Sequence, residues 1–221
     1  MEAPRRVRVW DAPVRIVHWL IALAMPALWW TAENDHMDWH HWLGYGVLGL
    51  LLFRLAWGFV GGSTARFSSF LRGPRAVIAY ARRLLSGETE TAIGHNPMGG
   101  WSVAALLALL AAEVGLGLFC VDVDGLEPGP LSRFVDFDAG RVAAHWHHWM
   151  FYALLVLIGL HLSAIAFYAV VKRENLVGPM LTGSRPAPEG VQPMTAAPLW
   201  RFLLAAAGAA ALAVWIARGL R

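Results

Sequence analysis

Cysteine is almost absent from this chain of 221 residues, which contains Cys120 alone. An internal disulfide framework is therefore excluded, as are covalent haem attachment through C-x-x-C-H and Cys-rich zinc or iron–sulfur centres. Charged residues are also scarce, at 15% of the chain against about 25% in a typical soluble domain. This scarcity argues against an ordinary soluble enzyme, and also against a disordered chain, which needs high charge and low hydrophobicity.

Apolar residues are abundant instead. Hydrophobic residues make up 57% of the chain, which includes 12 Trp and 22 Gly, and the mean hydropathy is +0.50. This composition is typical of an integral membrane protein, so membrane lipid is an expected partner. The net charge of +3 does not indicate nucleic-acid binding, because the basic residues lie in short segments between the apolar runs.

Five apolar runs are long enough to cross a bilayer core, which takes about 20 residues. Four of them cover residues 14–31, 40–60, 101–121 and 146–171. The fifth, residues 199–217, is Ala-rich and contains Arg201, so it either spans the membrane or lies along the interface. The sequence therefore predicts an all-α integral membrane protein, with a four-helix transmembrane bundle and a fifth C-terminal transmembrane helix. Residues 74–86 are expected to form an amphipathic helix, and residues 87–100 a loop.

The predicted domain organisation has three parts. They are a transmembrane domain at 1–175, a Pro-rich linker at 176–198 and a C-terminal transmembrane or interfacial helix at 199–221.

Basic and acidic residues alternate between successive connections. Arg and Lys concentrate before the first run, between the second and third, and after the fourth. The remaining connections are acidic; they contain Glu33, Asp35, Asp38, Asp122, Asp124, Glu127, Asp136 and Asp138. Because Arg and Lys mark the cytoplasmic side, we expect a cytoplasmic N-terminus and an acidic external face.

The chain has nine histidines, and ionisable side chains inside a membrane usually mark function. His161 lies deep in the fourth apolar run, and His147 precedes it by 14 residues. At about 100° per residue these two side chains project from nearly the same helix face, roughly 21 Å apart along the axis. His145 and His148 point well away from that face. Two histidines near opposite membrane surfaces suit two stacked cofactors.

Each of these histidines has a candidate partner at matching depth. The first run starts at the cytoplasmic side, which places His18 level with His161. The second run starts at the external side, which places His40 or His41 level with His147. The pairs His18–His161 and His40–His147 would supply two axial imidazoles to each of two haem irons, as electron transfer requires.

Three further residues are candidates for cofactor binding. Gly44 lies one turn after His40 on the same face, where it would let a flat macrocycle approach the backbone. Arg54 follows His40 by 14 residues and so lies near the level of the inner pair. We expect Arg54 to bind a haem propionate, with Arg15 as a second candidate.

Several stretches resemble the bacterial di-haem cytochrome b family, which includes b561-type cytochromes and the b-type subunit of nickel–iron hydrogenases. They occur in family order between residues 9 and 172. They are V-W-D-A-P-V-R-I-V-H-W (9–19), H-H-W-L-G-Y (40–45), F-R-L-A-W-G-F (53–59), G-H-N-P-M-G-G (94–100), G-P-L (129–131) and H-H-W…G-L-H (147–161).

The resemblance implies that residues 1–175 form a di-haem cytochrome b domain with two non-covalent haem b groups. Carried over by position, the four axial ligands of the haem irons are His18, His40, His147 and His161. The family often has Glu after the third of these, where this chain has His148. The choice of ligand among His145, His147 and His148, and between His40 and His41, therefore stays open.

The resemblance also implies a function. We expect a multi-pass protein of the bacterial inner membrane that relays electrons between a redox partner protein and the quinone pool. The partner would be a c-type cytochrome docked on the acidic face, a hydrogenase or another dehydrogenase subunit, and a bound quinone is a further expected cofactor. An electron-transfer subunit with no catalytic residue of its own is favoured over a stand-alone enzyme.

Two alternatives come from other classes of protein. The first is a stand-alone quinone-linked oxidoreductase that acts on a small external reductant such as superoxide, in a pocket lined by Arg133 or Arg141. The second is a non-redox membrane protein that binds zinc or copper through an outer cluster of His36, His40, His41, His145, His147 and His148.

Overall fold

The computed structural model describes residues 5–86, 94–187 and 190–221. Five long helices dominate it: α1 (Ala12–Glu33), α2 (Met37–Val60), α5 (Pro97–Gly117), α6 (Phe137–Val170) and α8 (Leu199–Ala217). All five are long and apolar enough to cross a membrane, which confirms the predicted fold class. The shorter elements are β1 (Arg6–Arg8), α3 (Phe67–Phe70), α4 (Pro74–Leu85), η1 (Ser132–Phe134), α7 (Val177–Thr182) and β2 (Ser184–Pro186).

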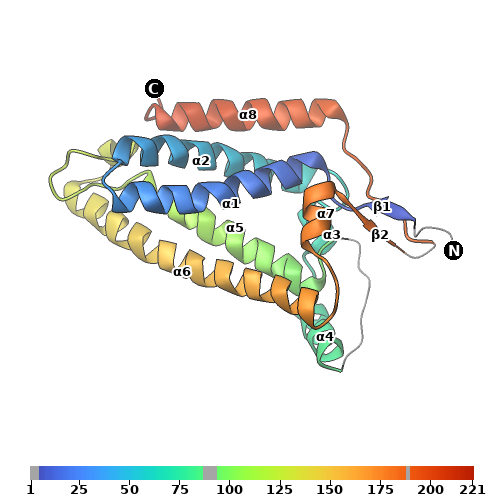
Figure 1. The fold of residues 1–221 in the computed structure, drawn as a ribbon. Helices are drawn as coiled ribbons and strands as arrows, with labels where there is room; N and C mark the ends of the chain where they lie inside the picture. The colour runs from blue at the N-terminus through green and yellow to red at the C-terminus, as the bar shows by residue number, and fades with distance from the viewer. Residues whose placement is uncertain (1–4, 87–93, 188–189) are drawn as a thin grey trace.

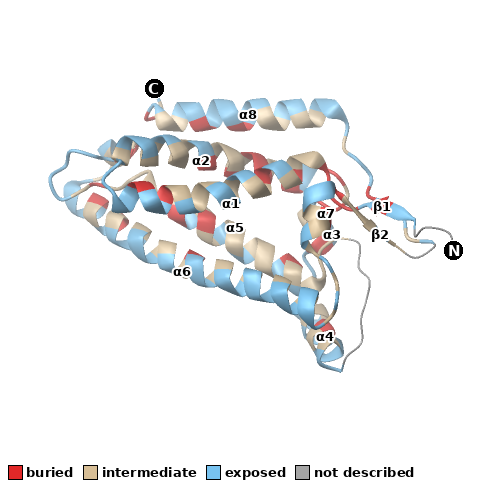
Figure 2. Ribbon diagram, in the orientation of Figure 1, coloured by how far each residue is buried: buried red, intermediate tan, exposed pale blue. Residues whose placement is uncertain are grey.

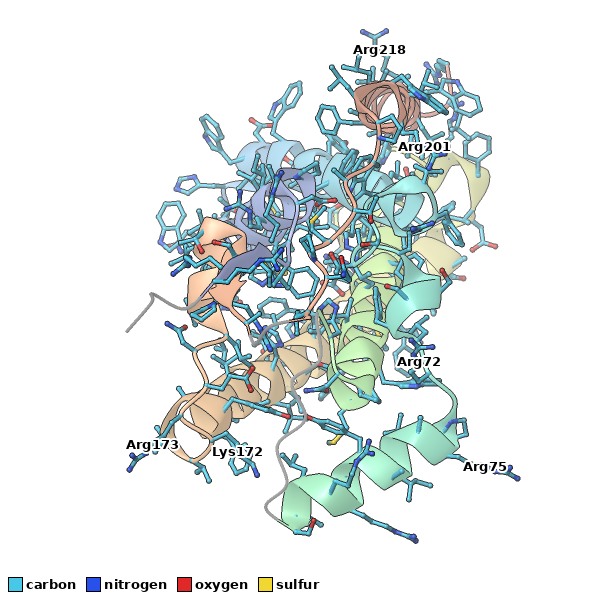
Figure 3. All side chains as sticks on the ribbon, turned by 90° about the vertical axis from the view of Figure 1, so that its right-hand side faces the viewer. Arg72, Arg75, Lys172, Arg173, Arg201 and Arg218 are labelled. Carbon is cyan, nitrogen blue, oxygen red and sulfur yellow. The ribbon has the colours of Figure 1, made fainter. Side chains whose placement is uncertain are left out.

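The long helices run alternately up and down (Figure 1). α1 packs on α2, α2 packs on α8, and α5 packs on α6. We call one end of the bundle the basic end; there α1, α5 and α8 begin and α2 and α6 finish. Arg72, Arg75, Lys172, Arg173 and Arg201 lie at this end (Figure 3). The opposite, acidic end carries the α1–α2 connection and residues 118–136. Figure 2 shows that the outward faces of α6 and α8 are largely exposed, as lipid contact requires.

A buried carboxylate joins the start of α1 to the end of α2. Asp11 is only 6% exposed. Its side chain accepts one hydrogen bond from the Val14 backbone N–H and another from Trp57 Nε1, both at 2.9 Å. The first bond caps α1, and the second fixes α1 against α2 within an apolar cluster that includes Val9 and Phe53. This junction fixes the start of α1, the helix that carries His18, against the end of α2.

The fifth long helix follows α2 over its whole length. Ala209 and Ala213 of α8 are buried, and a Cβ added at Gly49 of α2 would lie 3.6 Å from Ala213 Cβ. Contacts with the rest of the chain occur at both ends of α8. Arg201 Nη1 donates to the Val60 carbonyl oxygen at 3.5 Å, and the Arg133 side chain donates to the Gly219 carbonyl oxygen. This packing favours a fifth transmembrane helix over an interfacial one.

The third and fourth predicted spans have wrong boundaries. The third helix is Pro97–Gly117 rather than residues 101–121, because Asn96 caps it by accepting a hydrogen bond from the Gly99 backbone N–H at 2.7 Å. Residues 97–100 were predicted as loop and are helical; residues 87–93 of that loop lie outside the described residues. The fourth helix begins at Phe137, well before residue 146, because Asp136 caps it through the Ala139 backbone N–H. Hydropathy alone does not detect caps.

The α6 helix is longer than a bilayer core is thick. Its 34 residues extend about 51 Å, against a hydrocarbon thickness of about 30 Å.

Within the predicted Pro-rich linker, α7 and β2 are regular elements. The pairing of β2 with β1 is antiparallel, with Val7 opposite Arg185. The predicted division of the chain into three parts stays a prediction.

The junction at Asp11 gives a stability prediction. Asp11→Ala removes an N-cap, at a cost of about 1 kcal/mol, and leaves the buried Trp57 N–H without an acceptor, at about 1–3 kcal/mol. Asp136→Ala is the matched control, because Asp136 caps α6 from an exposed position with no buried indole attached. Thermal unfolding in detergent should show a clearly larger fall in Tm for Asp11→Ala. Equal falls would mean that the Trp57 bond contributes nothing.

Candidate cofactor-binding site

The structure brings the four predicted histidines together in two pairs. The ring centroids of His18 on α1 and His161 on α6 are 6.4 Å apart. Those of His40 on α2 and His147 on α6 are 6.2 Å apart. A metal–imidazole bond is about 2 Å, as in zinc sites, and a ring nitrogen lies about 1 Å from its centroid. Two imidazoles that share one metal ion therefore have centroids about 6 Å apart, and both pairs fit a bis-histidine centre.

Hydrogen bonds orient the two rings of the pair at the acidic end. His40 Nδ1 donates to the Leu28 carbonyl oxygen at 3.0 Å. His147 Nδ1 donates to the Glu113 carbonyl oxygen at 2.9 Å. With Nδ1 as the donor, Nε2 keeps its lone pair for a metal ion. Metal-binding histidines are held in this way in proteins generally, so this pair has the hydrogen-bond arrangement of a metal-binding pair.

The last turns of α5 contact the His147 imidazole through Glu113 and Gly117. Besides the backbone bond, Glu113 Oε1 lies 3.4 Å from His147 Nδ1. Glu113 is only 7% exposed, and its Oε2 has no hydrogen-bond partner among the described residues. A Cβ added at Gly117 would lie 3.0 Å from His147 Cε1. Sequence reasoning placed Glu113 and Gly117 in the third span but missed their contact with His147, since it depends on how α5 packs on α6.

The neighbouring histidines have other surroundings. His41 Nδ1 lies 4.0 Å from Glu127 Oε2, and the His148 ring lies against Tyr152. The His145 ring lies near the Trp146 and Trp149 rings, and the His36 ring near that of Trp30. Among the residues that the structure describes, no group of three or more His, Cys, Asp or Glu side chains is placed to hold a metal ion. His36, His41, His145 and His148 thus do not join His40 and His147 in a metal site of three or more ligands.

There is open space beside the pair at the acidic end. A Cβ added at Gly44, one turn from His40, would meet no atom within 4 Å. α6 packs closely on α5, but in the described part of the chain no comparable packing joins it to α1 or α2. Each histidine pair therefore bridges helices whose backbones stay apart, and this is the room that a flat macrocycle between two axial ligands needs.

Unpartnered polar atoms gather near the pair at the basic end. Five buried side-chain nitrogen or oxygen atoms lack a hydrogen-bond partner among the described residues. Four belong to residues at the basic end: Arg15 Nε, His18 Nδ1, Arg54 Nη1 and His95 Nδ1. Buried polar atoms are rarely left unpaired, so a group with acceptor oxygens is expected there. The carboxylates of a haem have that chemistry.

The two predicted arginines are held differently. Arg54 is 6% exposed, and its guanidinium lies 5.2 Å from the centroid of the Phe67 ring. Arg15 Nη1 donates to the Leu181 carbonyl oxygen, so only part of its guanidinium is available. Arg54 therefore fits the role of an anion partner better than Arg15.

His95 is a residue of this region that sequence reasoning left in a loop. Its ring lies between those of Trp10 and Phe70, at centroid distances of 4.6 and 4.9 Å. Burial, and then the Arg54 guanidinium and the histidine pair at the basic end, lower the pKa of His95 to about 3. His95 is therefore neutral at pH 7. The motif of residues 94–100 was the available signal, but only the fold places it near Arg54.

Comparison with known proteins covers most of the chain. The family described as "Prokaryotic cytochrome b561" matches residues 9–183. Three similar proteins are each named "Probable Ni/Fe-hydrogenase B-type cytochrome subunit". That of Azotobacter chroococcum mcd 1 is 25% identical over 81% of this chain and 88% of its own length. The protein of Bradyrhizobium diazoefficiens is 23% identical over 81% and 85%, and that of Azotobacter vinelandii 24% identical over 81% and 88%. No solved structure matches the chain.

The close contact between Gly117 and the His147 ring gives a prediction that compares two glycines of α5. Gly117→Val places a branched side chain against the imidazole, which must move from its position opposite His40. Gly115→Val is the control, because a Cβ at Gly115 meets nothing within 4 Å and the helix-propensity change is the same. Haem quantified per chain should fall in the Gly117 variant only. A full haem complement in both variants would contradict the idea that the contact with Gly117 positions the His147 imidazole.

Proposed function

Because the chain belongs to the prokaryotic cytochrome b561 family, we propose that it binds two haem b groups and relays electrons across the membrane between a redox partner and the quinone pool. Family membership makes it a membrane electron-transport protein with b-type haem. The proposal of two haem groups rests on two centroid distances, 6.4 Å between His18 and His161 and 6.2 Å between His40 and His147, which pair α6 with α1 and with α2. Both distances suit two imidazoles on one metal ion.

In this proposal the protein residues fix position, coordination and charge. A bound b-type haem supplies one-electron oxidation and reduction. The pair His18–His161 would hold one haem iron and the pair His40–His147 the other, and two histidine ligands on each iron suit electron transfer rather than oxygen binding. The backbone carbonyls of Leu28 and Glu113 hold the outer imidazoles in the ligating tautomer. These groups keep the ligand geometry constant while the redox state changes.

Polar side chains of the basic end bind the haem propionates. Arg54 is the main partner, since it is buried with a free N–H, and Arg15 is the second. Gly44 would let the outer haem approach the backbone of α2, since no side chain covers that position. An anion beside Arg54 also accounts for the absence of any described acidic partner in hydrogen-bond contact with it.

The relatives' names support a hydrogenase as the redox partner, since all three are called hydrogenase cytochrome subunits. A c-type cytochrome on the acidic end is the alternative donor or acceptor. The distribution of Arg and Lys supports a cytoplasmic basic end, with the N-terminus inside and the chain in the inner membrane. A quinone would bind near one of the two haem sites.

A stand-alone quinone-linked oxidoreductase that acts on a small external reductant gains no support from the two arginines considered for it. The Arg133 side chain donates to the Gly219 carbonyl oxygen, and Arg141 Nη1 donates to the Val121 carbonyl oxygen at 3.0 Å. Both guanidiniums thus form hydrogen bonds within the fold, to backbone carbonyl oxygens. Quinone-linked turnover by the isolated chain would favour that alternative over a subunit that is inert without its partner.

Histidine substitutions test the two sites separately. His18→Ala or His161→Ala should lower the haem content from two per chain to one, and His40→Ala or His147→Ala should remove the other haem. A bis-histidine centre that loses one axial ligand loses most of its non-covalent affinity. The measurements are pyridine haemochrome quantification and the reduced-minus-oxidised visible spectrum.

Matched controls are available in the same segments. His41→Ala, His145→Ala and His148→Ala should each keep two haems. Loss of a haem in one of these three, with retention in its neighbour, would reassign that ligand. Two haems in all four ligand variants would refute the sites altogether.

Arg54 is predicted to raise the reduction potential of the inner site, because reduction adds negative charge that a guanidinium stabilises. Arg54→Gln should therefore lower the midpoint potential of one haem and leave the other unchanged. A tenfold change in the one-electron equilibrium corresponds to about 59 mV. Potentiometric titration measures it, with Arg201→Gln at the same end of the bundle as control. Equal shifts in both variants would show a general surface-charge effect instead.

A further inference from the structure

The short helix α4 lies outside the bundle of long helices. It spans Pro74–Leu85, begins at a proline in its first turn and packs on α5. The long helices are seen nearly end-on in Figure 3, where α4 is drawn from the side across the bottom of the view, with Arg75 pointing outward. Figure 1 places it at the basic end, beyond α6. Its axis therefore lies across the bundle axis, in the plane of a membrane surface.

One face of α4 is fixed to the bundle by polar contacts. The buried Tyr80 shares a hydrogen bond of 2.7 Å with the Tyr168 hydroxyl of α6. Lys172 Nζ donates to the Leu84 carbonyl oxygen at 3.3 Å. The carbonyl oxygen of Arg72, just before the start of α4, accepts a hydrogen bond from Trp101 Nε1 at 2.8 Å. These contacts hold the helix in one orientation, so its opposite face is presented in a defined direction.

The opposite face combines arginine with aliphatic side chains. Arg75, Ile78, Arg82 and Leu85 follow one another at intervals of three and four residues, which places them on one side of a helix. Ile78 is 53% exposed and Leu85 is 88% exposed, and both arginines are exposed as well. Water is a poor surrounding for Leu85, whereas a headgroup layer above hydrocarbon accommodates both kinds of side chain.

The charge around this face is positive among the described residues. Arg72, Lys172 and Arg173 lie at the same end of the bundle (Figure 3). The described acids of this end are already engaged. Asp11 accepts from Val14 and Trp57, and Glu174 pairs with Arg185 at 3.0 Å.

We propose that α4 is an interfacial helix that binds anionic phospholipid headgroups through Arg75 and Arg82, with Ile78 and Leu85 inserted at the hydrocarbon boundary. Basic residues beside an anionic leaflet gain electrostatic attraction, and the aliphatic pair adds burial of apolar area. The helix thereby ties the connection between α2 and α5 to the membrane surface. The interaction is independent of the haem sites, so it stands or falls separately from the proposed function.

Lipid selectivity is the first test. The full chain is reconstituted in equal parts of phosphatidylglycerol and phosphatidylcholine and transferred to detergent, and the lipids that stay bound are counted by native mass spectrometry. The wild type should retain phosphatidylglycerol in excess. Arg75→Gln/Arg82→Gln should lose most of that excess, by about fivefold for each arginine. Arg218→Gln/Arg221→Gln, which removes two arginines near the acidic end, should keep it. Equal retention of both lipids by the wild type would overturn the proposal.

The depth of the aliphatic pair is the second test. Spin labels are placed by Ile78→Cys or Leu85→Cys in a Cys120→Ser background, which leaves the label as the only cysteine. In phosphatidylglycerol bilayers the labels should be accessible to oxygen and shielded from a water-soluble nickel chelate, and the double arginine variant should weaken this shielding. Labels open to the nickel chelate in those bilayers would refute insertion. Shielding that arises only on addition of other membrane proteins would assign the face to a protein partner instead.

Discussion

The distance between facing imidazoles is the constraint on which the rest of this structure depends. Under the proposed function, each pair has to stay one metal ion apart, while the helices that carry it stay far enough apart for a flat group between them. α6 meets this condition by packing on α5 and reaching α1 and α2 through His161 and His147. The bare surface at Gly44 leaves space free beside His40.

The two pairs are supported by different means. At the acidic end, backbone carbonyls of Leu28 and Glu113 hold the imidazoles directly, so that site is largely formed by the polypeptide. At the basic end, His18 Nδ1 and its neighbours Arg15 and Arg54 have unpaired buried nitrogens. Unpaired buried donors cost free energy, so under the proposed function an anionic group would complete the basic end.

The two ends of the bundle also differ in the polar contacts that join their elements. At the basic end, Asp11 joins α1 to α2, β1 pairs with β2, and α4 lies across the foot of α5 and α6. At the acidic end, the Arg133 side chain joins η1 to the C-terminal segment through the Gly219 carbonyl. The long helices gain little from the hydrophobic effect inside a membrane, so these polar junctions set how deeply each helix sits.

The sequence by itself determined the membrane class and the number of long helices and indicated which histidines could pair, because hydropathy and helical phase are local properties of the chain. The 14-residue spacing of His147 and His161 already put them on one face. Helix ends at Pro97 and Phe137 were misplaced, since side-chain caps decide them. Only the tertiary structure decided that His41 lies near Glu127 rather than His147, that Gly117 meets His147, and that His95 is buried near Arg54. These contacts join residues of different helices, and their distances depend on packing that no local pattern specifies.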